Sequence, residues 1–194
     1  MSQTFKINKS PDFRLFAYLK ADLHRARILL YGDSGNQSGI LLWLGIFSPR
    51  FLPVLFCRLA YFFYRLNIGP VAKVFSLLNF FLFGIEVGIR CHIGKGLFFP
   101  HTQGTVIGAL SIGENSIIFQ GVTLGSREID FSYQESLRPK VGDNVIIGSG
   151  AKVLGGITLG SGSRVGANAV VLNDVGPGLL AAGVPAKIIY KILQ

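Results

Sequence analysis

The sequence predicts a mainly β protein, a parallel β-solenoid that follows an α-helical N-terminal region. From residue 85 onward, aliphatic residues recur every six positions. Glycine follows eight of the thirteen residues that begin these six-residue units, although the chain of 194 residues contains only 25 glycines. Residues 1–84 instead carry apolar side chains at the spacing of a helix. We therefore expect two domains, residues 1–84 and 85–194.

Three helices are expected in the N-terminal domain. Ser10-Pro11-Asp12 is a typical helix start, with serine as N-cap and proline in the first turn, and the break at Gly32 ends this helix. Ser48-Pro49 repeats the start signal for a second helix. The third helix follows Gly69-Pro70 and ends near Gly84.

The charge balance favours an anionic partner, because the chain has 19 Lys and Arg, 10 Asp and Glu and a net charge of +9. Residues 34–85 contain no Asp or Glu and are rich in aromatic side chains. The cations of this segment are Arg50, Arg58, Arg65 and Lys73. The segment 40–84 is expected to face either an anionic membrane or another subunit. No stretch reaches the roughly 18 apolar residues of a membrane span. No basic stripe with interleaved stacking aromatics indicates a nucleic-acid site.

Cysteine usage and the N-terminal residues indicate a cytoplasmic protein. Cys57 and Cys91 form neither a CxxC motif nor a metal-ligand spacing. The N-terminal residues lack the apolar core of a signal peptide. We expect no metal and a location in the cytoplasm, peripheral to the inner face of the cytoplasmic membrane if segment 40–84 binds lipid.

The six-residue period predicts a triangular coil. Six residues make one short strand and a tight turn, and three such sides close a coil of about 18 residues. Gly, Asn and Asp suit the corners because they tolerate a left-handed backbone. The polar segment 126–140 breaks the period and is expected to loop out of the solenoid. The residues expected to point inward are Val87, Ile93, Phe99, Val106, Ile112, Ile118, Leu124, Val141, Ile147, Val153, Leu159, Val165 and Val171.

Several motifs in this region are specific when taken together. They are Phe83-Gly84-Ile85-Glu86-Val87, Ile93-Gly94-Lys95-Gly96-Leu97, Pro100-His101, Gln120-Gly121-Val122-Thr123-Leu124-Gly125, Pro139-Lys140-Val141-Gly142-Asp143 and Ala182-Gly183-Val184-Pro185-Ala186-Lys187. As a set they resemble the hexapeptide-repeat acyltransferases, above all the serine O-acetyltransferases and their relatives in polysaccharide gene clusters. The resemblance implies a left-handed parallel β-helix, an acetyl-CoA co-substrate and a homotrimer, with a hexamer left open.

The resemblance also implies a catalytic pair. In the family, a histidine at the place of His101 is the general base, and a carboxylate fifteen residues earlier, here Glu86, orients it. Transfer of an acetyl group from a thioester to a hydroxyl needs a base of near-neutral pKa, and the carboxylate fixes the tautomer of the ring. His24 and His92 are expected to be structural or surface residues. Cys91 is expected to be a small buried residue, since direct transfer needs no acyl-enzyme.

The resemblance further places acetyl-CoA in a groove between adjacent prisms of the trimer. The positions that it assigns to this cofactor are Gly125, Ser149, Ala167 and Lys187. Small residues let an extended pantetheine arm approach the backbone closely, and a lysine suits the phosphates. Lys152 and Arg164 are looser candidates for the phosphates.

Three positions depart from the pattern of the serine enzymes. Pro100 stands where the family has an Asp, Leu137-Arg138 where it has Arg-His, and Gly88-Ile89 where it has His-Pro. Proline cannot bind the ammonium of an amino acid, whereas Arg138 is a candidate for binding the acceptor. These departures favour a neutral acceptor, a sugar or saccharide intermediate of a surface polysaccharide. The alternatives are a serine O-acetyltransferase of cysteine biosynthesis and a non-enzymatic trimeric scaffold.

Overall fold

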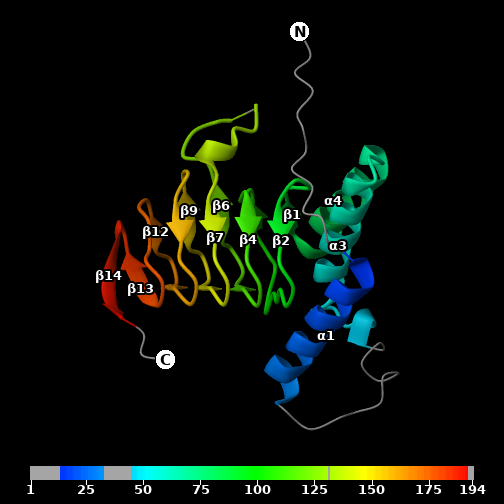
Figure 1. The fold of residues 1–194 in the computed structure, drawn as a ribbon, viewed down its shortest axis with the longest axis horizontal. Helices are drawn as coiled ribbons and strands as arrows, with labels where there is room; N and C mark the ends of the chain where they lie inside the picture. Colours follow the sequence, from blue (N-terminus) through cyan, green and yellow to red (C-terminus); the bar gives the residue numbers. More distant parts are fainter. Residues whose placement is uncertain (1–13, 33–44, 131, 192–194) are drawn as a thin grey trace.

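The computed structural model describes residues 14–32, 45–130 and 132–191. Helices lie at one end of the molecule, a left-handed β-helix forms its body, and an antiparallel hairpin closes the other end (Figure 1). The predicted fold class is therefore confirmed. The expected helix start at Ser10-Pro11-Asp12 lies outside the described residues.

The last helix ends at Phe83, and the first strand of the solenoid begins at Ile85. The helical elements are α1 (Leu15–Tyr31), the short 3-10 turn η1 (Gly45–Phe47), α3 (Leu52–Arg65) and α4 (Gly69–Phe83). Helix α3 starts later than Ser48-Pro49 predicts, because Pro53 rather than Pro49 occupies its first turn. Gly84 ends α4 in a left-handed conformation, with φ of 62°. No described helix is long and apolar enough to cross a membrane.

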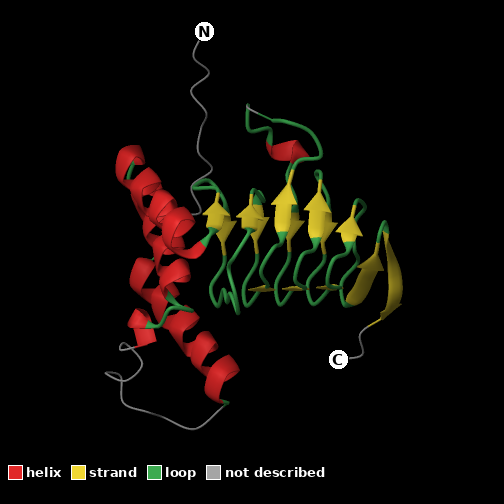
Figure 2. Ribbon diagram, turned by 180° about the vertical axis from the view of Figure 1, so that it is seen from behind, coloured by secondary structure: helices red, strands yellow, loops and turns green. Residues whose placement is uncertain are grey.

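The strands form three sheets, one on each face of a triangular prism (Figure 2). Face A contains β1 (Ile85–Val87), β3 (Thr105–Ile107), β6 (Thr123–Gly125), β9 (Lys152–Leu154) and β12 (Val170–Val171). Face B contains β2 (His92–Ile93), β4 (Ser111–Ile112), β7 (Lys140–Val141) and β10 (Thr158–Leu159). Face C contains β5 (Ile117–Ile118), β8 (Ile146–Ile147), β11 (Arg164–Val165), β13 (Leu179–Gly183) and β14 (Ala186–Lys191). All of these pairs are parallel except β13 with β14.

The predicted register is wrong at one position, Val106. Its side chain is 37% exposed, whereas Ile107 is 1% exposed and aligns with Val87 and Leu124 inside the prism. The other inward positions are buried as predicted. The cause is an uneven coil length. The strand partners Val87 and Ile107 lie 20 residues apart, Ile107 and Leu124 lie 17 apart, and the later partners Val153 and Val171 lie 18 apart.

The corners use the residues that the sequence suggests. Asn115, Asn144 and Asn168 have φ of 57°, 55° and 56°, which is the left-handed region. Asparagine enters this region at lower cost than most residues with a side chain. These corners let the chain turn sharply between two faces after a strand of only two or three residues.

A buried ion pair joins the helices to the first coil. The guanidinium of Arg58 contacts the carboxylate of Asp22 in α1 at 2.8 and 3.0 Å, and it donates to the carbonyls of Ile93 and Gly94 at 2.5 and 2.6 Å. Asp22 also accepts from the N–H groups of Gly96 and Leu97 at 2.7 and 3.1 Å. Arg58 is 2% exposed. Arg58 is therefore buried, whereas the sequence had suggested that it is a surface cation.

This ion pair generates a stability prediction. Asp22→Ala leaves the guanidinium of Arg58 buried without a counter-charge and leaves two N–H groups without an acceptor. We expect the free energy of unfolding to fall by about 3–5 kcal/mol, measured by urea denaturation followed by circular dichroism. The control is Asp174→Ala, which removes an exposed carboxylate bonded to a single N–H, with an expected loss of about 1 kcal/mol. Equal losses in the two variants would contradict the prediction.

Candidate functional site

His101 lies in an enlarged corner of the first coil, between faces C and A. Phe98 is bridged to Ile117 of the next coil, and Ile107 is paired with Leu124. The step from Phe98 to Ile107 in the first coil is nine residues, whereas the matching step from Ile117 to Leu124 in the second coil is seven. The two extra residues extend the backbone outward, and the His101 side chain is exposed there. The same two residues displace the hexad register that the sequence analysis assigned.

The enlarged corner is fastened to the end of α4. The hydroxyl of Thr102 donates to the carbonyl of Phe83 at 2.7 Å, and the N–H of Gly104 donates to the carbonyl of Gly84 at 2.9 Å. The backbone on the C-terminal side of His101 is thus fixed, while its imidazole faces solvent. A general base needs this combination of a fixed position and an accessible ring.

Glu86 lies on the outer side of face A, in the middle of β1. It is exposed and lines an open groove of about 430 Å³ between α4 and the first coil, together with Lys73 and Phe80. Glu86 is paired with Val106, five residues after His101. No hydrogen bond or ion pair joins the Glu86 and His101 side chains in the described part of the chain. Their catalytic pairing stays a prediction.

Two of the four predicted cofactor positions share the edge of the prism that carries His101, which we call the C–A edge. Ser149 follows β8 and Ala167 follows β11, and the N–H of Asn168 donates to the carbonyl of Ser149 at 2.8 Å, which stacks these corners on successive coils. Lys187 lies close to this edge, in β14, across from Ala182. The structure therefore places these three residues along one line from His101 toward the C-terminus.

Gly125 lies elsewhere, at the opposite side of face A. It ends β6 at the edge between faces A and B, where a side chain would meet nothing within 4 Å. Of the looser candidates, Lys152 is already engaged, because its amine donates to the carbonyl of Gly121 at 2.6 Å and to the hydroxyl of Thr123 at 3.1 Å. Arg164 is exposed on face C.

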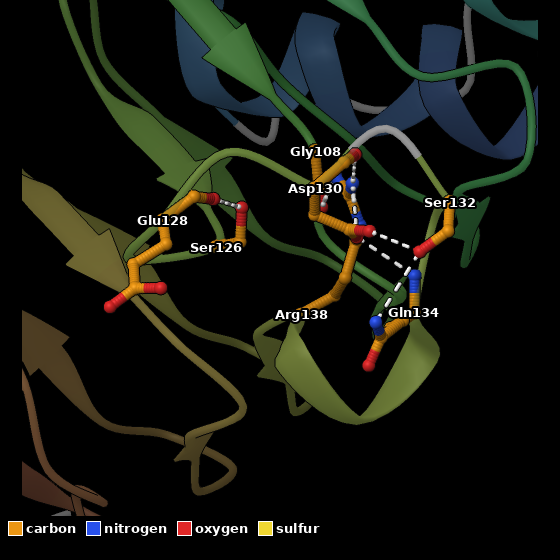
Figure 3. Close-up of polar contacts among 7 residues, drawn as sticks. All are labelled: Gly108, Ser126, Glu128, Asp130, Ser132, Gln134 and Arg138. Carbon is orange, nitrogen blue, oxygen red and sulfur yellow. Dashed lines mark hydrogen bonds and ion pairs between the residues drawn. The ribbon is translucent and has the colours of Figure 1, made fainter.

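Arg138 fastens the extruded loop, which projects from the coils (Figure 2). Its guanidinium contacts the carboxylate of Asp130 at 2.9 Å and donates to the carbonyl of Gly108 at 3.2 Å (Figure 3). Desolvation alone would raise the pKa of Asp130, but hydrogen bonds from the Gln134 N–H, the Ser132 hydroxyl and Arg138 lower it. The loop and Gly108 therefore hold the Arg138 guanidinium in place through two of its three nitrogens.

Tyr133 is a loop residue that the sequence analysis missed. Its ring contacts two guanidinium groups, with the Cζ atoms of Arg90 and Arg138 at 4.9 and 4.2 Å from the ring centre. Burial raises the pKa of Tyr133 to about 12, so the phenol stays protonated at neutral pH. Among the described residues, its hydroxyl and the Nε of Arg138 are buried without a hydrogen-bond partner. Both groups are donors, which suits an acceptor that carries a carboxylate.

The remaining histidines and cysteines have structural surroundings. Burial raises the pKa of the Cys91 thiol to about 12, so it is protonated at neutral pH and is no nucleophile. His92 packs against Tyr61, and burial together with Arg58 lowers its pKa. His24 is exposed on α1. The described residues contain no cluster of side chains that could hold a metal ion.

The fold and the site define a class, the hexapeptide-repeat acyltransferases. Residues 138–173 match the family model described as bacterial transferase hexapeptide (six repeats). Within this class, the chain belongs to the serine acetyltransferase family. It is 35% identical to the serine acetyltransferase of Synechococcus elongatus over 179 residues, which cover 91% of this chain and 70% of the relative. It is 40% identical to that of Helicobacter pylori J99 over 153 residues, which cover 78% of this chain and 85% of the relative.

Solved structures agree with this assignment. The serine acetyltransferase of Brucella abortus in complex with coenzyme A has a TM-score of 0.77 at 28% identity, covering 91% of this chain and 68% of that one. The soybean enzyme complexed with serine has a TM-score of 0.76 at 33% identity, covering 93% and 71%.

These comparisons correct the preferred sequence-based function. The prediction of a saccharide acceptor was wrong, and the serine alternative is the one that the relatives favour. The inference had rested on Pro100 and the other departures from the family pattern. Loss of one carboxylate beside the base does not exclude an amino acid as acceptor, because groups on other coils or on the loop can bind its ammonium.

The placement of His101 generates a prediction on rate. His101→Ala removes the only base carried by the enlarged corner and is expected to lower kcat at least about a hundredfold, measured by release of the donor thiol. The melting temperature is expected to stay unchanged because the side chain is exposed. Glu86→Gln is expected to lower kcat less, because it alters only the orientation of the ring. Wild-type rates in His101→Ala would reject the general-base role, and wild-type rates in Glu86→Gln would reject the orienting role.

Proposed function

We propose that the chain is a serine O-acetyltransferase, which moves the acetyl group of acetyl-CoA to the hydroxyl of L-serine. The observation that carries this proposal is the identity of 35% and 40% to two proteins of that name, over 91% and 78% of this chain. The matched lengths include both helical and solenoid residues.

The reaction needs only one base. As the serine oxygen attacks the thioester carbonyl, His101 accepts the hydroxyl proton. The bond between carbonyl carbon and sulfur then breaks, and the imidazolium returns the proton to the departing thiolate. The products are O-acetylserine and the free thiol of CoA, so protons and electrons balance without an oxidant. The protonated state of the Cys91 thiol agrees with direct transfer.

The C–A edge supports the proposed position of the cofactor. Neighbouring coils stack at the strand spacing of about 4.8 Å, which puts Ser149 about 10 Å and Ala167 about 15 Å along the prism from the coil of His101. An extended pantetheine arm can follow this line of small residues, and Lys187 supplies a charge for the phosphates at its far end. The same edge then presents the thioester to His101.

We also propose a homotrimer with the acceptor site between neighbouring subunits. In one chain, His101 precedes β3, and the Arg138 guanidinium bonds to Gly108 immediately after β3. Gly104 and Gly108, at the two ends of this strand, are separated by about 13 Å at the usual rise per residue. One small amino acid cannot bridge that length. A neighbouring subunit that brings its extruded loop beside the enlarged corner would complete the site.

The acceptor prediction is tested by a thiol-release assay. With acetyl-CoA as donor we expect saturable turnover with L-serine and none with O-methyl-L-serine, which lacks the attacking hydroxyl. Mass spectrometry should find a single added acetyl group on the serine product. His101→Ala is the matched control for hydrolysis and background. A folded, CoA-binding wild type that leaves L-serine unacetylated would reject the proposed acceptor.

The assembly prediction is tested by mixing two inactive variants. Arg138→Ala lacks the loop cation and His101→Ala lacks the base, so neither homotrimer should be active. In randomly mixed trimers, one interface in four pairs an intact His101 with an intact Arg138, and activity should recover to about one quarter of wild type. A site contained within one chain would give no recovery.

A further inference from the structure

The outward side of α4 is apolar, where a helix at a protein surface ordinarily presents polar residues. Val74, Leu77 and Phe81 follow one another along this side, with 53%, 54% and 73% of their surface exposed. We call them, with their exposed neighbours, the α4 ridge. The ridge consists of Val74, Leu77, Leu78, Phe80, Phe81 and Leu82.

The helical end of the molecule carries unbalanced positive charge. Its described residues, 14–32 and 45–84, contain eight Lys or Arg and a single acid, Asp22, which is buried against Arg58. Lys73 is exposed on α4 beside the ridge. Glu86, in β1, lines the groove on the flank of the helix together with Lys73 and with the ridge residues Leu77 and Phe80.

Two partners could cover such a ridge, a second copy of the chain or an anionic membrane, and the positive charge of the helical end favours the membrane. A second copy docked on the same face would bring two cationic helical ends together, and like charges would repel. An anionic bilayer supplies both missing partners, with phosphate groups for the cations and an apolar boundary for the leucine and phenylalanine side chains. The helix has only 15 residues, which suits a position parallel to the surface.

We propose that α4 binds the surface of an anionic membrane. The ridge lies at the boundary between headgroups and acyl chains, and Lys73 lies at the level of the phosphates. The C–A edge starts beside the end of α4, where the enlarged corner is bonded to Phe83 and Gly84, and it runs away from the helices toward Ser149 and Ala167. The proposal does not depend on which acceptor the enzyme uses.

The test is co-sedimentation of the full chain with lipid vesicles. We expect binding to vesicles that contain phosphatidylglycerol and not to pure phosphatidylcholine, with weaker binding as salt screens the charges. Val74→Glu/Phe81→Glu should abolish binding, and Lys73→Glu should weaken it by about tenfold. The matched control is Ile129→Glu/Val184→Glu, which places two acids at apolar sites of 83% and 73% exposure outside the helices. This control should bind like the wild type.

Three outcomes would overturn the proposal. One is a folded wild type that does not bind phosphatidylglycerol vesicles at low salt. Another is equal binding by wild type and Val74→Glu/Phe81→Glu. The third is a lower oligomer mass for Val74→Glu/Phe81→Glu in light scattering, because the ridge would then be a contact between subunits.

Discussion

The solenoid depends on closing the open edge of its first coil. Strands of two or three residues gain their backbone hydrogen bonds from the neighbouring coils, and the first coil has no coil before it. The Asp22–Arg58 pair takes that place on one side of the prism. It donates to two carbonyls and accepts from two N–H groups that would otherwise be buried without partners. At the other end of the solenoid, β14 covers the edge of β13 by antiparallel strand pairing.

This arrangement makes the helices part of the solenoid and not an appendage to it. Leu23 of α1 and Val54 of α3 belong to the same buried cluster as Ile85 and Phe99 of the first coil. The division at residue 84 is therefore a change of secondary structure within one hydrophobic core. The enlarged corner that carries His101 is bonded to the end of α4, so its position depends on the same helical packing.

The local pattern of the sequence was enough to predict the coils but not the contacts between distant residues. Val106 and Ile107 are both aliphatic, and only pairing with Val87 decides which one points inward. Nothing in the local sequence distinguishes Arg58 from Arg65. Arg58 differs because it pairs with Asp22, which lies 36 residues earlier in the chain. No residue pattern predicts the contact of Tyr133 with Arg90 and Arg138, because that contact forms only when the loop folds back on the coils.

The candidate site shows the same limit. The motifs that surround His101 in the chain are enough to propose it as the base, whereas the engagement of Arg138 depends on its contacts with Asp130 and Gly108. The acceptor was misjudged because it was inferred from Pro100 and the two other departures from the family pattern. Changed residues near the base are a poor guide to the substrate, because they do not show contacts between distant residues such as that of Arg138 with Asp130.

The uneven coils also bear on how such a chain can change in length. Each six-residue unit turns the chain by one face, so six residues inserted within a coil would rotate every later side chain by one third of a turn around the prism. The enlarged corner that carries His101 causes no such rotation. Its two extra residues bulge outward, and Ile107 is again aligned with Val87. The extruded loop does the same before Val153 aligns with Leu124. Length variation is therefore tolerated where a corner can bulge, and the rotational phase of all later coils is preserved.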